Sequence, residues 1–341
     1  SYVLILVPAA DRMLVSVVCF GLFWAAYELA FVASRAVFDG LVNDVVPKQF
    51  LGRFYGLFRA VALVDGMVFN FWIMGRVPTH FTLILCVIAV FYGIALTWMC
   101  LKVREGRYPP PEETAAGGWG GRAGGGGLLL RFAAEIRTYC RECFSNSYYL
   151  LVFIMLMLGT ASLAPLNVFQ IPYASHLGVS MDLYGRYLSL VFLISLILSF
   201  FLGWLCDVFH PLRVAMASLA GYACAMLVGG LYATTPASFL AVWVGHGVLA
   251  GCYFTSVASL GLRLFPHARF AQFASAATMF TSLANMTIAP LIGTLIDVTG
   301  KFYRLTFFAG LAASVFALVC AAFVHARFMK LGGPKNYAAP E

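Results

Sequence analysis

The apolar residues of this sequence form nine long runs, separated by short polar or proline-containing stretches. A helix needs about 20 mostly apolar residues to cross the hydrocarbon core of a bilayer, and each run is long enough. A helix also pairs all the backbone groups of such a run within lipid. The pattern therefore predicts an all-α membrane protein with nine spans, at residues 13–45, 52–75, 81–103, 147–172, 184–209, 213–232, 237–263, 271–297 and 303–328.

One connection, residues 104–146, is much longer than the others. Its proline-rich start and the stretch AAGGWGGRAGGGG are typical of a flexible linker. Its last part places Leu129, Phe132, Ile136 and Tyr139 on one helical face, as in a helix lying on a membrane surface, although a solvated linker helix fits too. We expect a partial N-terminal bundle at 1–103, this cytoplasmic loop at 104–146, a six-helix bundle at 147–330 and a cytoplasmic tail at 331–341.

The composition supports the membrane reading, because 62% of the residues are hydrophobic and 11% are charged, against about 25% charged in soluble domains. The net charge of +8 follows topology, so we expect the lipid bilayer and no nucleic acid as a partner. Most basic residues of the connections fall on the side of the long loop, which we place in the cytoplasm with the C-terminus. This distribution suits the inner membrane of a bacterium. The opposite side carries Arg12, Arg76, Arg186, Lys301 and Arg304.

Three charged residues lie within the first span, at Glu28, Arg35 and Asp39. Their spacing brings them within about 40° of one helical face, over roughly 16 Å of the axis. A charge at bilayer depth costs at least a few kcal/mol, so this face is expected to line protein or water. Glu28 and Arg35 are candidates for a substrate or ion pathway, whereas Asp39 fits a packing ion pair with Arg35.

The next span carries Arg59, Asp65 and Asn70. Asp65 lies near the middle of the span, where burial would raise the pKa of a carboxyl and let it bind and release a proton. We take Asp65 as a candidate coupling residue. Asn70 is either part of the pathway or a hydrogen-bonding contact between helices, and Arg59 fits an ion pair near the cytoplasm.

Formal charge is rare in the later spans, and the polar candidates there are mostly amides. Asn167 and Gln170 are three residues apart and share a helical face, so both can bind the hydroxyl groups of a sugar. Tyr173 can stack on a sugar ring. His246 is either a proton relay or a histidine satisfied between helices, and Asn285 precedes the proline of a bendable helix.

The sequence offers little for metal or cofactor chemistry. Its nine cysteines mostly lie in apolar runs, and Cys140-x-x-Cys143 has no second pair with which to bind zinc. The glycine run at 117–127 lacks the lysine of a nucleotide-binding loop. We expect no cofactor, no metal and no catalytic residue.

Two connections resemble each other, NDVVPKQFLGRFYGLF around Pro47 and LRLFPHARFAQFASAA around Pro266. They lie six spans and the long loop apart, which predicts a six-span repeat and twelve spans in all. The chain starts with Ser1 inside an apolar stretch. We therefore expect it to be truncated and to hold the fourth to the twelfth helix.

Three segments resemble the major facilitator superfamily of secondary transporters, and most closely its sugar:cation symporters of the glycoside–pentoside–hexuronide and sucrose-transporter-like type. They are FDGLVNDVVPKQFLGRFYGLFRA, TYCRECFSNSYYLLVF and GWLCDVFHPLR. The resemblance implies a helical bundle with a central cavity lined by the span of Glu28. It also implies a cytoplasmic gate at Gly203 and Asp207, with Arg213 as the basic partner. Val208 and His210 replace the usual basic residue and glycine of the gate motif.

These features together predict a monomeric secondary active transporter with alternating access. Its substrate would be a small polar solute, a sugar or glycoside, carried in symport with H⁺ or Na⁺. One alternative is a proton-driven exporter of amphipathic compounds, which the mostly uncharged second half would suit. A non-transporting receptor or scaffold is another. A membrane enzyme would need clustered His, Asp or Glu residues, and the six histidines are scattered.

Overall fold

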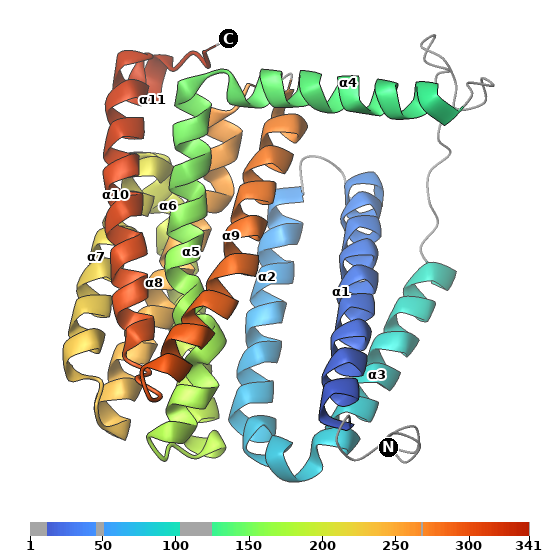
Figure 1. Cartoon of the computed structure of the whole chain (residues 1–341), viewed down its shortest axis with the longest axis vertical. Coiled ribbons are helices and arrows are strands. Elements are labelled where there is room, and N and C mark those ends of the chain that lie inside the picture. The colour runs from blue at the N-terminus through green and yellow to red at the C-terminus, as the bar shows by residue number, and fades with distance from the viewer. Residues whose placement is uncertain (1–11, 46–50, 103–124, 267–268, 341) are drawn as a thin grey trace. The chain divides into compact units, whose positions relative to one another are not determined.

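A computed structural model describes residues 12–45, 51–102, 125–266 and 269–340, and Figure 1 shows them as an assembly of helices. No strand occurs among these residues, which confirms the all-α prediction. The first three helices are α1 (Arg12–Val45), α2 (Leu51–Val68) and α3 (Val77–Lys102), and the long loop holds α4 (Gly125–Phe144). The remaining helices are α5 (Ser147–His176), α6 (Met181–Phe209), α7 (Pro211–Tyr232), α8 (Pro236–Leu264), α9 (Phe270–Val298), α10 (Leu305–Lys330) and the short α11 (Gly333–Asn336).

The predicted spans correspond to these long helices within a few residues at each end. Eight segments of the described chain are long and apolar enough to cross a membrane, and one of them, Ala60–Lys102, has 43 residues. At 1.5 Å per residue this segment measures about 65 Å, twice the thickness of the hydrocarbon core. It also contains a π-helical turn at Phe69–Ile73 and a non-helical backbone at His80. It therefore supplies two crossings, as the sequence predicts for 52–75 and 81–103.

The described residues divide into two compact units, with the divisions after Ala60 in α2 and after Ile84 in α3. The first unit contains α1, residues 51–60 of α2 and residues 85–102 of α3. The second contains residues 61–84 and everything from α4 onward. The related segments around Pro47 and Pro266 include positions 46–50 and 267–268, which lie outside the described residues, so the predicted repeat stays a prediction.

The second unit has its core among the six helices α5–α10. Helix α5 packs against α9 and α10, α7 packs against α8 and α10, and α6 packs against α8. Large aromatic side chains, such as Trp243, Tyr222 and Phe307, are fully buried between them. Polar side chains begin several helices: the Asn146 oxygen accepts from the Tyr148 N–H, and Thr235 and Ser238 form a reciprocal cap at the start of α8.

Helix α6 also packs closely against residues 61–84. A Cβ atom added to Gly185 would lie 2.3 Å from the Asn70 carbonyl oxygen, so only glycine fits there. One turn further along α6, the Ser189 hydroxyl donates to the Met67 carbonyl at 2.9 Å. Helix α6 thus lies against the end of α2 and the π-helical turn at Phe69–Ile73 that follows it.

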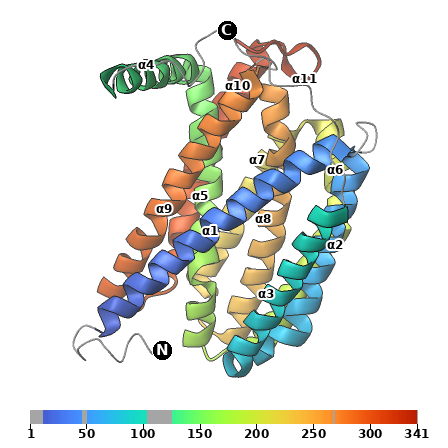
Figure 2. The same ribbon diagram turned by 90° about the vertical axis from the view of Figure 1, so that its right-hand side faces the viewer.

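Helix α4 runs crosswise to α5, at the end of the bundle where α5 begins (Figures 1 and 2). The Tyr139 hydroxyl bonds to the Ser275 hydroxyl of α9 at 2.9 Å, and the Gln272 amide donates to Glu142 at 2.9 Å. Cys143 is fully buried in the adjoining core, where burial raises the pKa of its thiol. These contacts hold α4 crosswise, which is the geometry expected of a helix on a membrane surface.

Candidate functional site

Two amides of α5 form the centre of a polar network inside the second unit. Asn167 is exposed and Gln170 is half-buried, so both present part of their amide to the surroundings of the bundle. The Gln170 amide donates to the Asn167 carbonyl at 2.8 Å, and its oxygen accepts from the indole N–H of Trp243 at 2.8 Å. The first of these bonds joins the Gln170 side chain to the backbone of Asn167, and the predicted role of the two amides as a pair stays a prediction.

The buried side of this network is His246 on α8. Its exposed fraction is 2%, and both ring nitrogens are bonded: Nε2 to the Asn167 Oδ1 at 2.9 Å and Nδ1 to the Tyr222 hydroxyl at 3.0 Å. The Tyr222 hydroxyl also donates to the Ser162 carbonyl of α5 at 3.2 Å. His246 is thus a histidine whose two ring nitrogens are both bonded between helices. Its alternative role as a proton relay stays a prediction.

Two prolines flank the amide pair on α5, which runs as one continuous helix from Ser147 to His176. Pro165 and Pro172 lie inside this helix, and each lacks the N–H that would bond to the carbonyl four residues earlier. Each proline leaves one carbonyl of the preceding turn without its usual helical partner, close to the amide pair.

Tyr173 does not lie with the amide pair. It is 2% exposed, packs against Phe239, Tyr303 and Phe307, and donates its hydroxyl to the Ala233 carbonyl. Its position six residues after Asn167 rotates it about 120° around the helix, toward α7 and α10. The stacking role expected beside the amides is therefore not available to this side chain, and Trp243 is the aromatic residue that contacts the pair.

The remaining pathway candidates are dispersed over other helices. Asn285 is exposed on α9, and within the described residues no hydrogen bond joins it to the network. Asn70 is 8% exposed and donates to the Gly66 carbonyl of its own helix at 2.6 Å, at the start of the π-helical turn. Glu28 and Asp65 are exposed, and the side chains of Arg35, Asp39 and Arg59 lie outside the described part of the chain.

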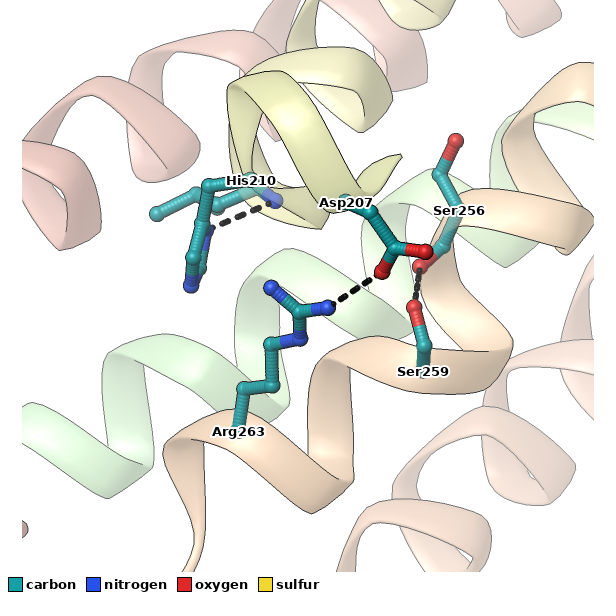
Figure 3. A network of polar contacts seen from close by, with 6 residues as sticks. Asp207, His210, Ser256, Ser259 and Arg263 are labelled. Atoms are coloured by element: carbon teal, nitrogen blue, oxygen red, sulfur yellow. Dashed lines mark hydrogen bonds and ion pairs between the residues drawn. The ribbon is translucent and has the colours of Figure 1, made fainter. Parts of the chain in front are cut away.

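The gate motif contains a different ion pair from the one expected. Asp207, near the end of α6, accepts from Arg263 of α8 at 2.8 Å, as Figure 3 shows. Arg213 instead donates to the Nε2 atom of His325 on α10 at 3.2 Å. Helix α7 begins at Pro211, immediately after the chain reverses, and the first turn of α7 directs Arg213 toward α10. The expected pairing of Asp207 with Arg213 is therefore wrong.

His210 occupies the reversal between α6 and α7, and its backbone explains why glycine is usual at this position of the motif. Its φ of 76° is in a region that side chains rarely adopt, and its ψ is 134°. The ring is 5% exposed, packs against Phe328 and caps α7 by accepting from the Leu212 N–H at 3.3 Å (Figure 3). Burial, with the neighbouring charges of Arg263 and Arg213, lowers the pKa of His210 to about 4. Gly203, by contrast, is exposed with open space around it.

Sequence reasoning missed Trp243, Tyr222 and Arg263. Trp243 had a usable signal, because it precedes His246 by three residues and so shares its helical face. Arg263 closes the predicted span at 237–263 on the side of the gate. Tyr222 had no such signal, since its contact with His246 depends on how α7 packs against α8.

Comparison with known protein families gives one match. The model of a family described as the Major Facilitator Superfamily matches residues 149–336, more than half of the chain. The matched region covers the amide network and the gate motif. No curated protein and no solved structure matches.

Proposed function

The chain belongs to the Major Facilitator Superfamily, and from this premise we propose that it carries a small polar solute, a sugar or glycoside, by symport with H⁺ or Na⁺. It is an integral multi-pass membrane protein of a family of secondary transporters. The observation that supports the solute class is the amide pair on α5, which is partly accessible on one side and held by α8 on the other.

The amide pair suits a ligand with several hydroxyl groups. A side-chain amide has two N–H donors and two acceptor lone pairs. Among the described residues, hydrogen bonds use one of these positions on the Asn167 side chain and two on the Gln170 side chain. The others remain for a solute, and their mixture of donors and acceptors matches the hydroxyls of a sugar. Because His246 and Trp243 fix the two amides, little rotamer entropy is lost on binding.

His246 offers a way to couple a proton to this pair. The Tyr222 hydroxyl donates to the Ser162 carbonyl, so the Tyr222 oxygen accepts from Nδ1–H of the His246 ring. When the ring is protonated at both nitrogens, it also donates through Nε2–H to the Asn167 Oδ1. Loss of the proton from Nε2 leaves an acceptor facing an acceptor, and rotation of the Asn167 amide by 180° restores the bond. The proton at His246 would thus set which end of the Asn167 amide faces the solute.

The first half of the chain holds further candidates for ion coupling. Glu28 and Asp65 are exposed carboxylates on helices of the membrane region, and Arg35 is on the same helical face as Glu28. We assign them to ion coupling, and we assign the Asp207–Arg263 pair to closure on the cytoplasmic side. The C-terminus and α4 lie on that side in this proposal, and the membrane is the inner membrane of a bacterium.

Tryptophan fluorescence tests the solute class directly, because Trp243 donates to Gln170. Sugars and glycosides are titrated into the purified protein, and a lipophilic cation serves as the competing class. We expect the sugars to change the emission of the unmodified protein and of Trp204→Phe, whose indole is exposed on α6. The change should disappear in Trp243→Phe, and Gln170→Leu should weaken binding about tenfold, the effect of losing roughly one hydrogen bond.

A response to the lipophilic cation alone would favour the second candidate, an exporter of amphipathic compounds. The charged residues of α5–α9 lie near the ends of these helices, which leaves their middle parts suited to such compounds. A response to sugars that persists in Trp243→Phe would place the solute elsewhere.

A further inference from the structure

A cavity lies at the end of the six-helix bundle opposite α4. It has a volume of about 180 Å³ and is formed by the end of α5, the connection between α7 and α8, and the connection between α9 and α10. Figure 1 shows the end of α5 and these two connections together at the lower end of the bundle. The amide network and the gate are built from other residues, so this cavity is separate from both.

The lining of this cavity is cationic. It includes Lys301, Arg304 and His176, together with the hydroxyl-bearing residue Thr234, and no Asp or Glu of the described chain lines it. Three potentially positive side chains around one small space repel one another, and a bound anion removes that repulsion. The cavity also lies at the N-terminal end of the 26-residue helix α10, whose dipole adds positive potential there.

Arg304 and His176 each contact an aromatic ring. The Arg304 guanidinium lies 5.0 Å from the ring centre of Phe302, and one of its nitrogens donates to the Leu231 carbonyl at 3.5 Å. The His176 ring lies 5.0 Å from the ring of Tyr303. A cation held by an aromatic ring and one carbonyl keeps further N–H donors for a ligand.

The backbone at Lys301 provides an independent observation. Its φ is 65°, and the preceding Gly300 has a φ of 69°, so two consecutive residues adopt the left-handed conformation at the end of α9. Glycine satisfies this conformation without cost, whereas lysine does not. Lys301 therefore occupies a strained backbone position on the rim of the cavity, where its ammonium group is one of the positive charges of the lining.

We propose that this cavity binds a phosphate-type anion, either free phosphate or the phosphate of a lipid headgroup. Arg304 and Lys301 provide the charge, and His176 and Thr234 provide further hydrogen-bond donors. The position at the ends of membrane-spanning helices suits both sources, because lipid phosphates lie at this depth and dissolved anions also reach it. The proposal does not depend on which solute the protein carries.

Thermal unfolding of the protein in a phosphate-free, uncharged detergent tests the proposal. One arm adds inorganic phosphate against chloride at equal ionic strength, and the other adds phosphatidylglycerol against the same amount of an uncharged diacylglycerol. We expect at least one arm to raise the unfolding midpoint by about 2 to 4 °C. A rise with phosphate identifies a free anion as sufficient, and a rise with phosphatidylglycerol alone identifies a lipid headgroup.

The variants Lys301→Asn and Arg304→Gln should lose this rise. Asparagine tolerates a positive φ, so the first variant removes the charge with little change to the turn. Lys330→Gln, at the other end of α10, is the matched control and should keep the rise. If Arg304→Gln does not fold, Arg304→Lys should retain part of the rise, and Lys301→Asn still decides. Absence of a rise in both arms for the unmodified protein, or an equal rise in Lys301→Asn, would overturn the proposal.

Discussion

His210 shows how one residue combines a backbone requirement with a side-chain contact. The chain must reverse between α6 and α7, and it does so at a φ of 76°. The motif usually meets this demand with glycine, whereas here an imidazole occupies the position, caps α7 and packs against Phe328. The substitution exchanges freedom of the backbone for a buried ring.

Replacing His210 by glycine and by alanine separates these two contributions. Both variants lose the ring, but only alanine keeps the strain of a side chain at this φ, which costs about 1 to 3 kcal/mol. We therefore expect His210→Gly to be more stable than His210→Ala by at least about 1 kcal/mol, measured by denaturant unfolding in detergent. Equal stability of the two variants would show that the reversal relaxes when the ring is removed.

The same residue makes stability depend on pH. The pKa of His210 is about 4 in the folded protein, because of burial and then the charges of Arg263, Arg213 and His325, against about 6.5 in an unfolded chain. Between pH 4 and pH 6.5 the unfolded state binds a proton at His210 that the folded state does not. The contribution of this residue to the free energy of unfolding is therefore fully present above about pH 6.5 and is lost as the pH falls. From pH 7 to pH 5 the loss should reach up to about 2 kcal/mol. His210→Asn should lose less over this range, and an identical decline in both proteins would contradict the assignment.

At the scale of helices, glycines decide which elements can approach closely. Gly185 on α6 faces the Asn70 carbonyl, while Gly245 on α8 has no atom within 4 Å of an added Cβ. Gly185→Ala should therefore force α6 away from residues 61–84 and destabilise the protein by about 1 to 3 kcal/mol. Gly245→Ala should be neutral or slightly stabilising, because alanine favours the helix. Thermal unfolding of the two variants side by side checks the contrast, and an equal loss in both would mean that helix context rather than contact is responsible.

The pairing of α6 with α8 at the gate is also testable. Arg263 and Asp207 are 38% and 76% exposed, so their attraction is screened and should contribute no more than about 1 kcal/mol. A double-mutant cycle on Asp207→Asn and Arg263→Gln should give a coupling of about 0.2 to 1 kcal/mol. The cycle with Arg213→Gln in place of Arg263→Gln should give none, and the reverse result would restore the pairing expected from the sequence.

At the scale of the whole molecule, helix number and order could be predicted from the sequence, because the length of an apolar run determines whether it spans a bilayer. Partners across helices could not. Arg213 follows Asp207 closely in the sequence, yet the turn at Pro211 directs it to His325, and Arg263 arrives from a different helix. Tyr173 shares a helix with Asn167, but its angular position places it in the core instead of beside the amides. Such contacts depend on the rotation and packing of each helix, which hydrophobic patterning does not specify.

The position of the amide pair on one helical face could be inferred from the sequence, and its role in binding stays a proposal. Asn167 and Gln170 are three residues apart, so their shared face follows from helical periodicity alone. The spacing could not predict the hydrogen bonds that Trp243 and His246 of α8 form with the two amides. Because the chain belongs to a transporter family, we propose this supported pair as the solute site.

Ion-driven uptake in proteoliposomes tests the central claim most directly. Labelled sugars and glycosides are offered to vesicles holding the protein under an imposed H⁺ gradient and, separately, an imposed Na⁺ gradient. The account predicts accumulation with one of the gradients and its collapse when that gradient is dissipated. It also predicts a loss of at least about tenfold in Gln170→Leu and in Asn167→Leu, with Trp204→Phe unchanged. The account would be contradicted if neither gradient drove accumulation of any sugar or glycoside offered. It would also be contradicted if the Asn167→Leu and Gln170→Leu variants took up as much as the unmodified protein.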